Sequence, residues 1–373
     1  MKKNRFLTVA ALLAGFAALL PCSALQPGEK ALPLAKLEWV NGAPFRVDPL
    51  GGEEPPELRA VVFVLCRAAI ADENVANLAS LQRALGGRFR GAIVTPDPVD
   101  DARALLVRHP SLALPVGVDR ERKLTAQYMA GSLLYPQAFL IRRDGTILWR
   151  GEVIDLAEAV TGALAGKLDI RTEAEVSRRI DELQSRMRDR EERQQQRILH
   201  EIFRLVPDHP AAIRMRLFVL ENTGRYAEAW RFLEERIKAV PGSARLYFTA
   251  LELAARSGAD DARLEWLLAG FRRNIADPKM QLMMAWSLLV RFPENPIALR
   301  SAAALLPATG DDFNFLVARA TFKARIGDLK GALEDQNRAA AAARAAGNEN
   351  AAAAALRSAE FLKTAIELAG GKP

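Results

Sequence analysis

A step of 34 residues recurs in the second half of the chain and limits the folds that this half can adopt. Gly224 and Gly258 lie 34 residues apart, as do Pro207 and Pro241. Gly327 follows Gly224 by 103 residues, close to three such steps, and both glycines are followed by an apolar residue at +2 and an alanine at +5. A unit of this length cannot bury its apolar face alone. The pattern therefore predicts paired helices stacked on their neighbours.

The G-x-Y-x-x-A pattern at Gly224 resembles the tetratricopeptide repeat. The match is good over residues 207–258 and 312–346 and poorer over 278–310, where the expected glycine turn is replaced by a proline-containing segment. The resemblance implies an all-α solenoid over residues 202–370, with an alanine-rich end, that binds a protein or peptide partner.

Two arginines are candidate partner-binding residues in this region. Arg214 and Arg216 lie on the first helix of the best-matching repeat, and only one of them can face the groove together with Leu217. A mildly cationic groove would suit an acidic peptide. The alternative is that both arginines are solvated surface residues.

Residues 32–168 follow a different pattern, in which short apolar strands alternate with helical stretches. The Asp144-Gly145 pair predicts a type I′ hairpin turn between two of the strands. This part of the chain therefore predicts an α/β domain. The predicted strands are 61–65, 91–95, 114–118, 137–141 and 146–150, and the predicted helices are 70–85, 99–108, 122–130 and 156–165.

Residues 171–201 are rich in Arg, Glu and Gln and carry apolar residues at helical spacing. This pattern predicts one long amphipathic helix that connects the two domains. We expect either a solvated connector or a coiled-coil seam between two copies of the chain.

The first 24 residues have the pattern of a secretory signal: basic residues, an apolar run and a small-residue site that ends at Ala24. We expect cleavage there, a mature chain that begins at Leu25, and a periplasmic or secreted protein. Lipid attachment at Cys22 is the alternative. Cleavage leaves Cys66 as the one cysteine, so no internal disulfide is expected.

Charge and composition exclude several function classes. The formal charge of +7 includes three leader cations, and no basic run interleaved with aromatics supports nucleic-acid binding. Because the three histidines share no ligand spacing with each other or with a cysteine cluster, neither a metal site nor a cofactor is predicted. No segment of the mature chain resembles a membrane-spanning helix.

Three segments in the first domain carry a resemblance to the thioredoxin-like superfamily, in particular to exported redoxins of the peroxide-reductase and thiol-disulfide oxidoreductase type. They are 37–44 with the strand at Val61, the P-x-x-F-L-I segment that begins at Pro136, and the D-G-x-I-x-x-x-G segment at 144–151. The resemblance covers about 130 residues. It implies a thioredoxin-like fold in which Pro136 is cis and faces the active site.

The resemblance does not extend to the cysteine pair that carries out the reaction in these redoxins. The two positions of the family's C-x-x-C pair fall on Ala68 and Ala71, so dithiol exchange by the usual route is not possible. Cys66 lies two residues before the first of these positions. One interpretation makes Cys66 a buried small residue; the other makes it a reactive thiol whose pKa is lowered by Arg67 and the following helix.

Two functions therefore remain open on sequence grounds. The first is a non-catalytic binding or scaffold protein that holds a partner on its solenoid. The second is an oxidoreductase or peroxidase of the redoxin class that uses Cys66 alone with an external thiol.

Overall fold

The computed structural model describes residues 24–48, 56–130, 136–188, 191–258, 260–306 and 310–370. The chain divides into two compact units, Met1–Arg214 and Met215–Pro373. The boundary lies inside a helix and not at either end of the predicted connector 171–201. The leader segment before Ala24, with Cys22, lies outside the described residues, so its cleavage and lipid attachment stay predictions.

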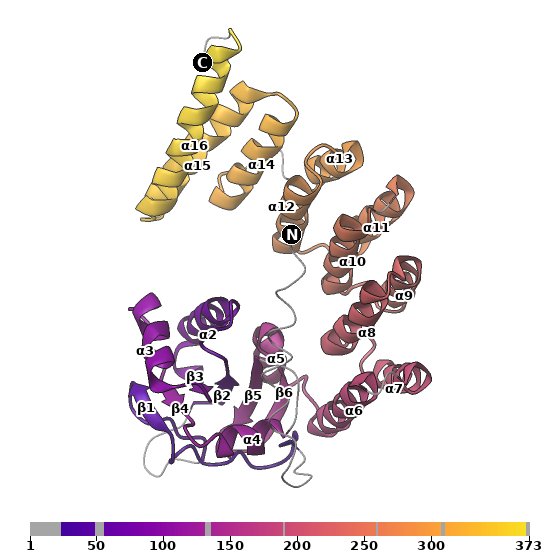
Figure 1. Ribbon diagram of the computed structural model, residues 1–373. Coiled ribbons are helices and arrows are strands. Elements are labelled where there is room, and N and C mark those ends of the chain that lie inside the picture. The colour runs from indigo at the N-terminus through magenta and orange to yellow at the C-terminus, as the bar shows by residue number, and fades with distance from the viewer. Residues whose placement is uncertain are drawn as a thin grey trace. The chain divides into compact units, whose positions relative to one another are not determined.

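The first unit contains a six-stranded mixed sheet in the order β1-β4-β3-β2-β5-β6 (Figure 1). Strands β2, β3 and β4 run parallel to one another, whereas β5 and β6 form an antiparallel hairpin at one side and β1 pairs antiparallel with β4 at the other. The strands are β1 (Glu38–Asn41), β2 (Leu58–Phe63), β3 (Phe89–Thr95), β4 (Val116–Val118), β5 (Gln137–Arg142) and β6 (Ile147–Glu152).

Strand β2 lies in the middle of the sheet and is buried along its whole length. Ala60 and Val62 point into one core and Val61 and Phe63 into the other, as the two-residue period of a strand requires. The predicted strand at 61–65 is therefore confirmed as part of β2, which ends at Phe63 and is buried on both faces.

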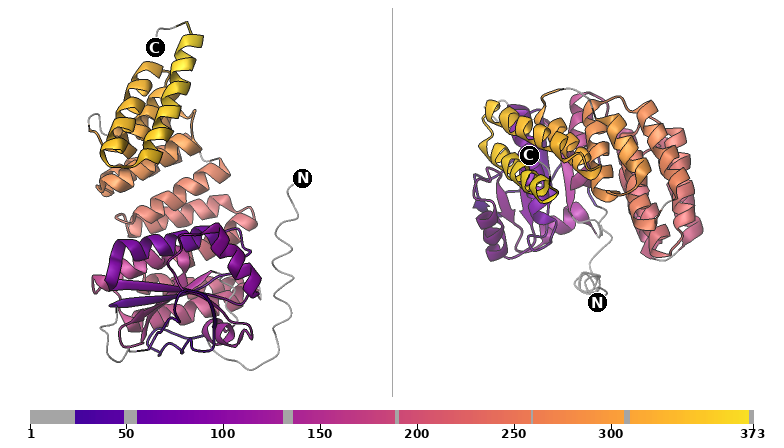
Figure 2. Two further views of the ribbon diagram at one scale, coloured as in Figure 1. Left: turned by 90° about the vertical axis from the view of Figure 1, so that its left-hand side faces the viewer. Right: turned by 90° about the horizontal axis from the view of Figure 1, so that it is seen from above.

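Helices cover both faces of the sheet, which the left view of Figure 2 shows close to edge-on. Helices α2 (Ala71–Leu85), α3 (Val99–Arg108) and α5 (Leu156–Leu164) supply buried residues to one core, and α4 (Lys123–Met129) supplies Tyr128 and Met129 to the other. All four predicted helices of this domain are confirmed to within two residues at each end.

Two local details differ from the sequence prediction. Strand β1 is not among the predicted elements, because its four residues are only half-buried and carry no clear alternation. The hairpin at Asp144-Gly145 is not a type I′ turn, since Gly145 alone has a positive φ (83°) there. The Gly145 N–H donates to the carbonyl of Arg142, which makes a type I turn followed by a glycine in the left-handed region.

The predicted long helix over 171–201 is wrong in its continuity. The structure has two helices, α6 (Ile170–Arg188) and α7 (Glu192–Leu205), which pack against each other. Helix α6 also packs against β6 and buries Val176, Ile180 and Leu183. Because this apolar stripe is covered within the first unit, neither a solvated connector nor a seam between two chains describes it.

An ion pair between a buried arginine and a half-buried aspartate joins α6 to the sheet. The Arg150 side chain on β6 is 2% exposed, and its guanidinium contacts both carboxylate oxygens of Asp181 on α6, with one nitrogen–oxygen distance of 3.1 Å. The Gln26 side chain donates to the same carboxylate (3.0 Å).

The second unit is helical throughout its described residues. Four helices begin 34, 34 and 35 residues apart, at Pro210, Ala244, Pro278 and Phe313, and each is followed by a second helix with which it forms a pair. The helices are α8 (Pro210–Asn222), α9 (Tyr226–Ala239), α10 (Ala244–Ser257), α11 (Asp261–Asn274), α12 (Pro278–Arg291), α13 (Pro296–Leu305), α14 (Phe313–Arg325), α15 (Leu329–Ala345) and α16 (Glu349–Leu368).

The glycines that set the repeat step end the first helix of three pairs. Gly224, Gly258 and Gly327 have φ values of 71°, 70° and 85°, a conformation that glycine adopts without strain. The alanines five residues after the first and third of these, Ala229 and Ala332, are fully buried. The α12–α13 pair lacks such a glycine; α13 begins instead with a proline behind the side-chain cap of Asn295.

Among the described residues, no helix has the length and the apolar composition that crossing a bilayer requires.

We predict that Asp181→Ala lowers the free energy of unfolding of the first unit by about 3 kcal/mol, because it leaves Arg150 buried without a counter-ion. Hydrogen-exchange mass spectrometry of peptides that cover β5 and β6 would report this unit alone. Glu182→Ala is the matched control: it removes a surface partner of Arg179 on the same helix and should cost less than about 1 kcal/mol. Equal effects of both substitutions would contradict the role given to the Arg150–Asp181 pair.

Candidate functional site

The site that the sequence singles out lies where strands β2 and β3 end at the same edge of the sheet. In open sheets with parallel strands, ligand and active sites form at this edge. The segment after β2 carries Cys66, Ala68 and Ala71, and the segment after β3 carries Asp97. Pro136 precedes β5 at the same edge, because Phe63 at the end of β2 pairs with Gln137.

Cys66 is buried, with 2% of its surface exposed, and belongs to the core that α2, α3 and α5 share. Its backbone is fixed by two neighbours: the N–H donates to Asp97 Oδ2 (2.6 Å), and the carbonyl accepts from Arg108 Nη2 (3.2 Å). These contacts come from two different segments of the sheet edge, so the position of Cys66 is set by tertiary structure.

The pKa of the Cys66 thiol is raised above its ordinary value. Burial is the largest cause, and the charges of Asp97 and Asp101 add to it, while a hydrogen bond with Thr95 opposes the shift. Arg67 does not lower this pKa as one interpretation required, because its guanidinium points away and pairs with Asp101 (2.8 Å). The geometry favours Cys66 as a structural residue.

Ala68 and Ala71 occupy the turn that leads into α2. Ala68 is half-buried, whereas Ala71 is the first helical residue and is 1% exposed. The Ala71 N–H donates to the Ala68 carbonyl (2.9 Å), which closes a turn between the two positions. Ala68 and Ala71, the positions that the resemblance assigns to the C-x-x-C pair, thus lie in one hydrogen-bonded turn at the start of α2, and neither carries a thiol.

Pro136 is half-buried, and its carbonyl accepts from the Val153 N–H (3.3 Å). The predicted cis bond joins Pro136 to Tyr135, which lies outside the described residues, as does the segment from Gly131 to Tyr135. The cis geometry and a contact of Pro136 with a client protein therefore stay predictions.

The charged groups around this edge neutralise one another. Asp72, in the first turn of α2, accepts hydrogen bonds from Arg108 and His109 at the end of α3, each at 2.9 Å. These bonds, that of His109 first, lower the pKa of the Asp72 carboxyl. His109 is the residue that ends α3, and Asp100 and Asp101 lie in the first turn of the same helix.

Arg214 is engaged inside the first unit and does not have the groove-facing position considered for it. Its guanidinium bonds to Glu152 Oε1 at the end of β6 (2.8 Å) and to Asp155 Oδ2 in the following turn (2.6 Å). These carboxylates lie about 60 residues earlier in the chain, which the repeat pattern could not reveal. Arg216 lies in the second unit and is half-buried.

His209 lies just before α8, next to the Arg214 cluster. Its Nδ1 accepts from the Ala212 N–H (3.3 Å) and so caps the start of the helix. The pKa of His209 is lowered to about 4: burial is the largest cause, the Arg214 charge acts in the same direction, and the charges of Asp155 and Asp208 oppose the shift. The imidazole is therefore neutral at physiological pH, as its role as acceptor requires.

Sequence reasoning missed two residues that fix this site, Asp97 and Arg108. Asp97 belongs to the Pro96-Asp97-Pro98 breaker, which by its composition marks only the end of a strand. The position of Asp97 could have revealed its role. Strands β2 and β3 are parallel neighbours, so Asp97 after β3 lies beside Cys66 after β2. Within the described ranges, no group of three or more His, Cys, Asp or Glu side chains is placed to hold a metal ion.

Comparisons with solved structures find similar folds for the first two fifths of the chain. The bacterioferritin comigratory protein of Xanthomonas campestris, studied for alkyl peroxide reduction, is 17% identical, and the match covers 40% of this chain and 100% of that one with a TM-score of 0.30. A cysteine-to-serine mutant of peroxiredoxin Q from Xanthomonas campestris is 16% identical over 39% of this chain and 99% of that one, also with a TM-score of 0.30.

The thioredoxin domain of a Bacteroides vulgatus thiol-disulfide oxidoreductase is 15% identical over 37% of this chain and 97% of that one, with a TM-score of 0.30. No protein-family model matches the chain, and no curated protein matches its sequence. The mixed six-stranded sheet with helices on both faces matches a thioredoxin-like α/β domain. That assignment rests on the strand order and pairing described above.

We predict that the first unit loses stability as the pH falls below neutrality, in part through His209. A folded-state pKa of about 4 lies below the unfolded value of about 6.5. The stabilisation is therefore complete above the unfolded value and is lost as the pH falls toward the folded one. Between about pH 7 and about pH 5 this loss amounts to roughly 1 to 2 kcal/mol.

His209→Asn keeps a cap acceptor without a titrating group and should remove this part of the pH dependence. Urea unfolding of both chains at the two pH values would show it. His200→Asn is the control, since it removes a histidine from α7 and should leave the dependence unchanged. The same pH dependence in wild type and His209→Asn would contradict the prediction.

Proposed function

We propose that the protein is an exported, non-catalytic binding protein, in which a thioredoxin-like domain without thiol chemistry is joined to a tetratricopeptide-type solenoid that holds a protein or peptide partner. One observation supports the proposal that the domain is not a thiol enzyme. Where the dithiol would lie, the residues are Ala68 and Ala71, and the thiol nearest to them in sequence, Cys66, is 2% exposed.

The chemistry of thiols explains why this observation supports the first of the two functions considered. Disulfide exchange needs a thiolate that an external disulfide can reach and a second thiol that resolves the mixed disulfide. Reaction with peroxide needs an exposed thiolate with a lowered pKa. Cys66 is buried, its pKa is raised, and its closest charged neighbour by hydrogen bond is the carboxylate Asp97. These properties all disfavour a single-cysteine redoxin.

The tetratricopeptide part of the proposal is supported by the helix spacing of the second unit. The first helices start 34 to 35 residues apart, and left-handed glycines end three of them. Ion pairs also link successive first helices: Glu221 on α8 pairs with Arg256 on α10 (2.9 Å), and Glu252 on α10 pairs with Arg291 on α12 (3.2 Å). The first helices therefore lie side by side and present a common face.

An exposed apolar stripe on this face is the proposed contact for the partner. Met283, Trp286 and Val290 lie at positions i, i+3 and i+7 of α12 and are 51%, 42% and 59% exposed. Large apolar side chains grouped on one helical face are typical of surfaces that bind another chain. The partner segment that fits such a stripe is itself apolar along one side.

Export rests on the leader sequence alone. A thioredoxin-like domain without its cysteines, placed outside the cytoplasm, would serve as a second, rigid binding surface in the same chain as the solenoid.

We predict that the wild-type chain neither reduces insulin disulfides nor consumes alkyl peroxide above the rate of the reagents alone. Ala68→Cys with Ala71→Cys should form an intrachain disulfide, because the hydrogen-bonded turn holds the two positions within the roughly 7 Å that such turns span. Mass spectrometry after alkylation would detect that disulfide. Turnover by the wild-type chain that disappears in Cys66→Ser would establish the single-cysteine enzyme instead.

We also predict that a photoreactive residue at Val290 crosslinks to a discrete partner in the native host, whereas one at Arg273 on α11 does not. Trp286→Ser in the Val290 chain should lower the crosslinked yield severalfold. Trp266→Ser is the matched control, because Trp266 is a similarly exposed tryptophan (38%) on α11, the second helix of its pair. Equal crosslinking at both positions, or equal loss in both tryptophan variants, would contradict the proposed face.

A further inference from the structure

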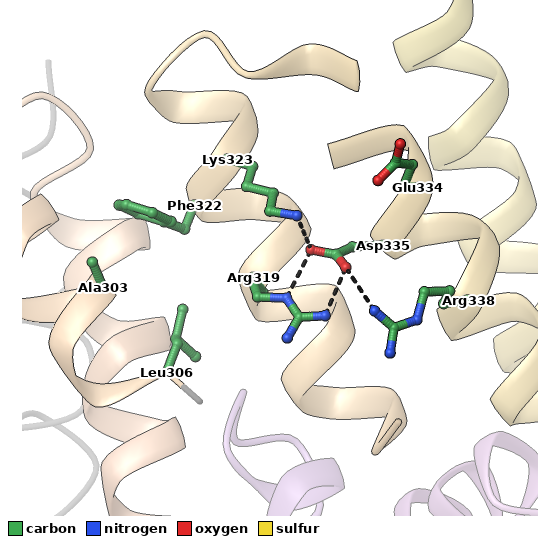
Figure 3. Close-up of a pocket in the computed structure, with 8 residues that line it drawn as sticks. All are labelled: Ala303, Leu306, Arg319, Phe322, Lys323, Glu334, Asp335 and Arg338. Carbon is green, nitrogen blue, oxygen red and sulfur yellow. Dashed lines mark hydrogen bonds and ion pairs between the residues drawn. The ribbon is translucent and has the colours of Figure 1, made fainter. Parts of the chain in front are cut away.

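A pocket of about 370 Å³ opens in the second unit between the end of α13 and the helices α14 and α15. Figure 3 shows that one side of the pocket is lined by apolar side chains and the other by charged side chains. Ala303, Leu306 and Phe322 form an apolar side, whereas the opposite side is charged. This volume lies within the range of about 300 to 1,000 Å³ that is usual for sites of small organic groups. The charged lining residues are Arg319, Lys323, Glu334, Asp335 and Arg338.

Three cations converge on one buried carboxylate in this pocket. The Asp335 side chain is 2% exposed and accepts from Arg319 Nε and Nη2 at 2.8 and 2.7 Å. Lys323 Nζ lies 2.9 Å from the same carboxylate, and Arg338 Nη1 lies 3.7 Å from it. Burial alone would raise the pKa of Asp335, but the hydrogen bonds from Arg319 and Lys323 outweigh it and lower the pKa. Asp335 is thus ionised at neutral pH.

Two of the cations keep hydrogen-bond capacity toward the pocket. Lys323 donates to Asp335 and to the Gly331 carbonyl, which uses two of its three ammonium hydrogens. Arg338 uses Nη2 for the Gly310 carbonyl and Asp311, which leaves Nε and also Nη1, since Nη1 lies 3.7 Å from Asp335 and so beyond hydrogen-bond distance. The Lys323 and Arg338 side chains are 26% and 48% exposed.

The charge of the lining residues favours a monoanion. Three cations face two carboxylates, those of Asp335 and Glu334, so the lining carries a formal charge of +1. Asp311, which lies in the loop before α14 and does not line the pocket, accepts a hydrogen bond from Arg338 Nη2 (2.5 Å) and is 81% exposed. One additional carboxylate would balance the lining, whereas a phosphate dianion would exceed its charge and would face an apolar wall.

We propose that this pocket binds a carboxylate that carries an apolar or aromatic group. The carboxylate lies against Lys323 and Arg338, and the apolar group lies against Leu306 and Phe322. Asp335 does not compete for the ligand; it holds the cations in place before the ligand arrives. Such a ligand has two sources, the carboxyl end of a peptide whose last residue is apolar and a free organic acid. The inference rests on the proposed function and deepens it, since it gives the chemistry of the partner's end.

Calorimetric titration of the full chain with N-acetyl-phenylalanine and with its amide tests the proposal. The acid should bind and the amide should bind about tenfold or more weakly, because a charge-assisted hydrogen bond is lost. Affinity for the acid should fall as salt is added. Equal binding of acid and amide, or no binding of either, would overturn the proposal.

Charge-removing variants locate the site. Lys323→Gln and Arg338→Gln should each weaken binding of the acid about tenfold, while Lys330→Gln and Arg325→Gln remove the same charges from exposed positions on α15 and α14 and should not. Thermal unfolding of each variant checks that the fold is kept. If the exposed-position variants weaken binding as much as the pocket variants, the site is not this pocket.

Two peptides separate the sources and keep this proposal distinct from the proposed function. An acetylated Ala-Ala-Phe peptide with a free carboxyl end and the same peptide amidated are titrated in parallel. Binding of the free-ended peptide alone supports a peptide end as ligand. If N-acetyl-phenylalanine binds and the free-ended peptide does not, the pocket is a site for a small organic acid and not for the end of a peptide. If both peptides bind equally, the chain binds peptides as the proposed function requires, but the carboxylate is not recognised and the proposal for this pocket is wrong.

Discussion

Burial of strand β2 on both faces is the constraint on which the first unit depends. Its side chains alternate between two cores, and Ala60, Val62, Val64 and Cys66 all enter the core under α2, α3 and α5. The thiol therefore continues the inward register of the strand beyond its last paired residue. Filling the core with Cys66 removes the thiol from solvent, so the same period that builds the sheet also buries this sulfur.

The sheet edge of the first unit and the helices of the second unit differ in how far their charged and apolar side chains are already paired or covered. At the sheet edge of the first unit the charged groups pair with one another, as Asp72 does with Arg108 and Arg67 does with Asp101. In the second unit, by contrast, α12 exposes an apolar stripe, and the pocket beside α14 has cations with remaining hydrogen-bond capacity.

Much of the fold could be predicted from the sequence, because its elements are fixed by local period and by turn residues. Examples of such elements are the strands that are rich in β-branched residues and the helices that end at Gly224 and Gly258. The break between α6 and α7 was missed, since both halves share one helical period and the break is stabilised by a contact nine residues apart, from the Gln195 side chain to the Arg186 carbonyl. The pairing of Arg214 with Asp155 and the Asp97 bond to Cys66 depend on long-range packing that no local pattern encodes.

The most direct test of the central claim, that this thioredoxin-like domain has no usable thiol, is the labelling rate of Cys66 in the native full chain carrying Cys22→Ser. A buried thiol with a raised pKa should react with an aromatic disulfide reagent only when the domain opens, so labelling should be slower than that of a free thiol by orders of magnitude. The rate should rise with urea in step with unfolding. Labelling of the native chain at or above the rate of a free thiol at neutral pH would contradict the claim and restore the single-cysteine enzyme.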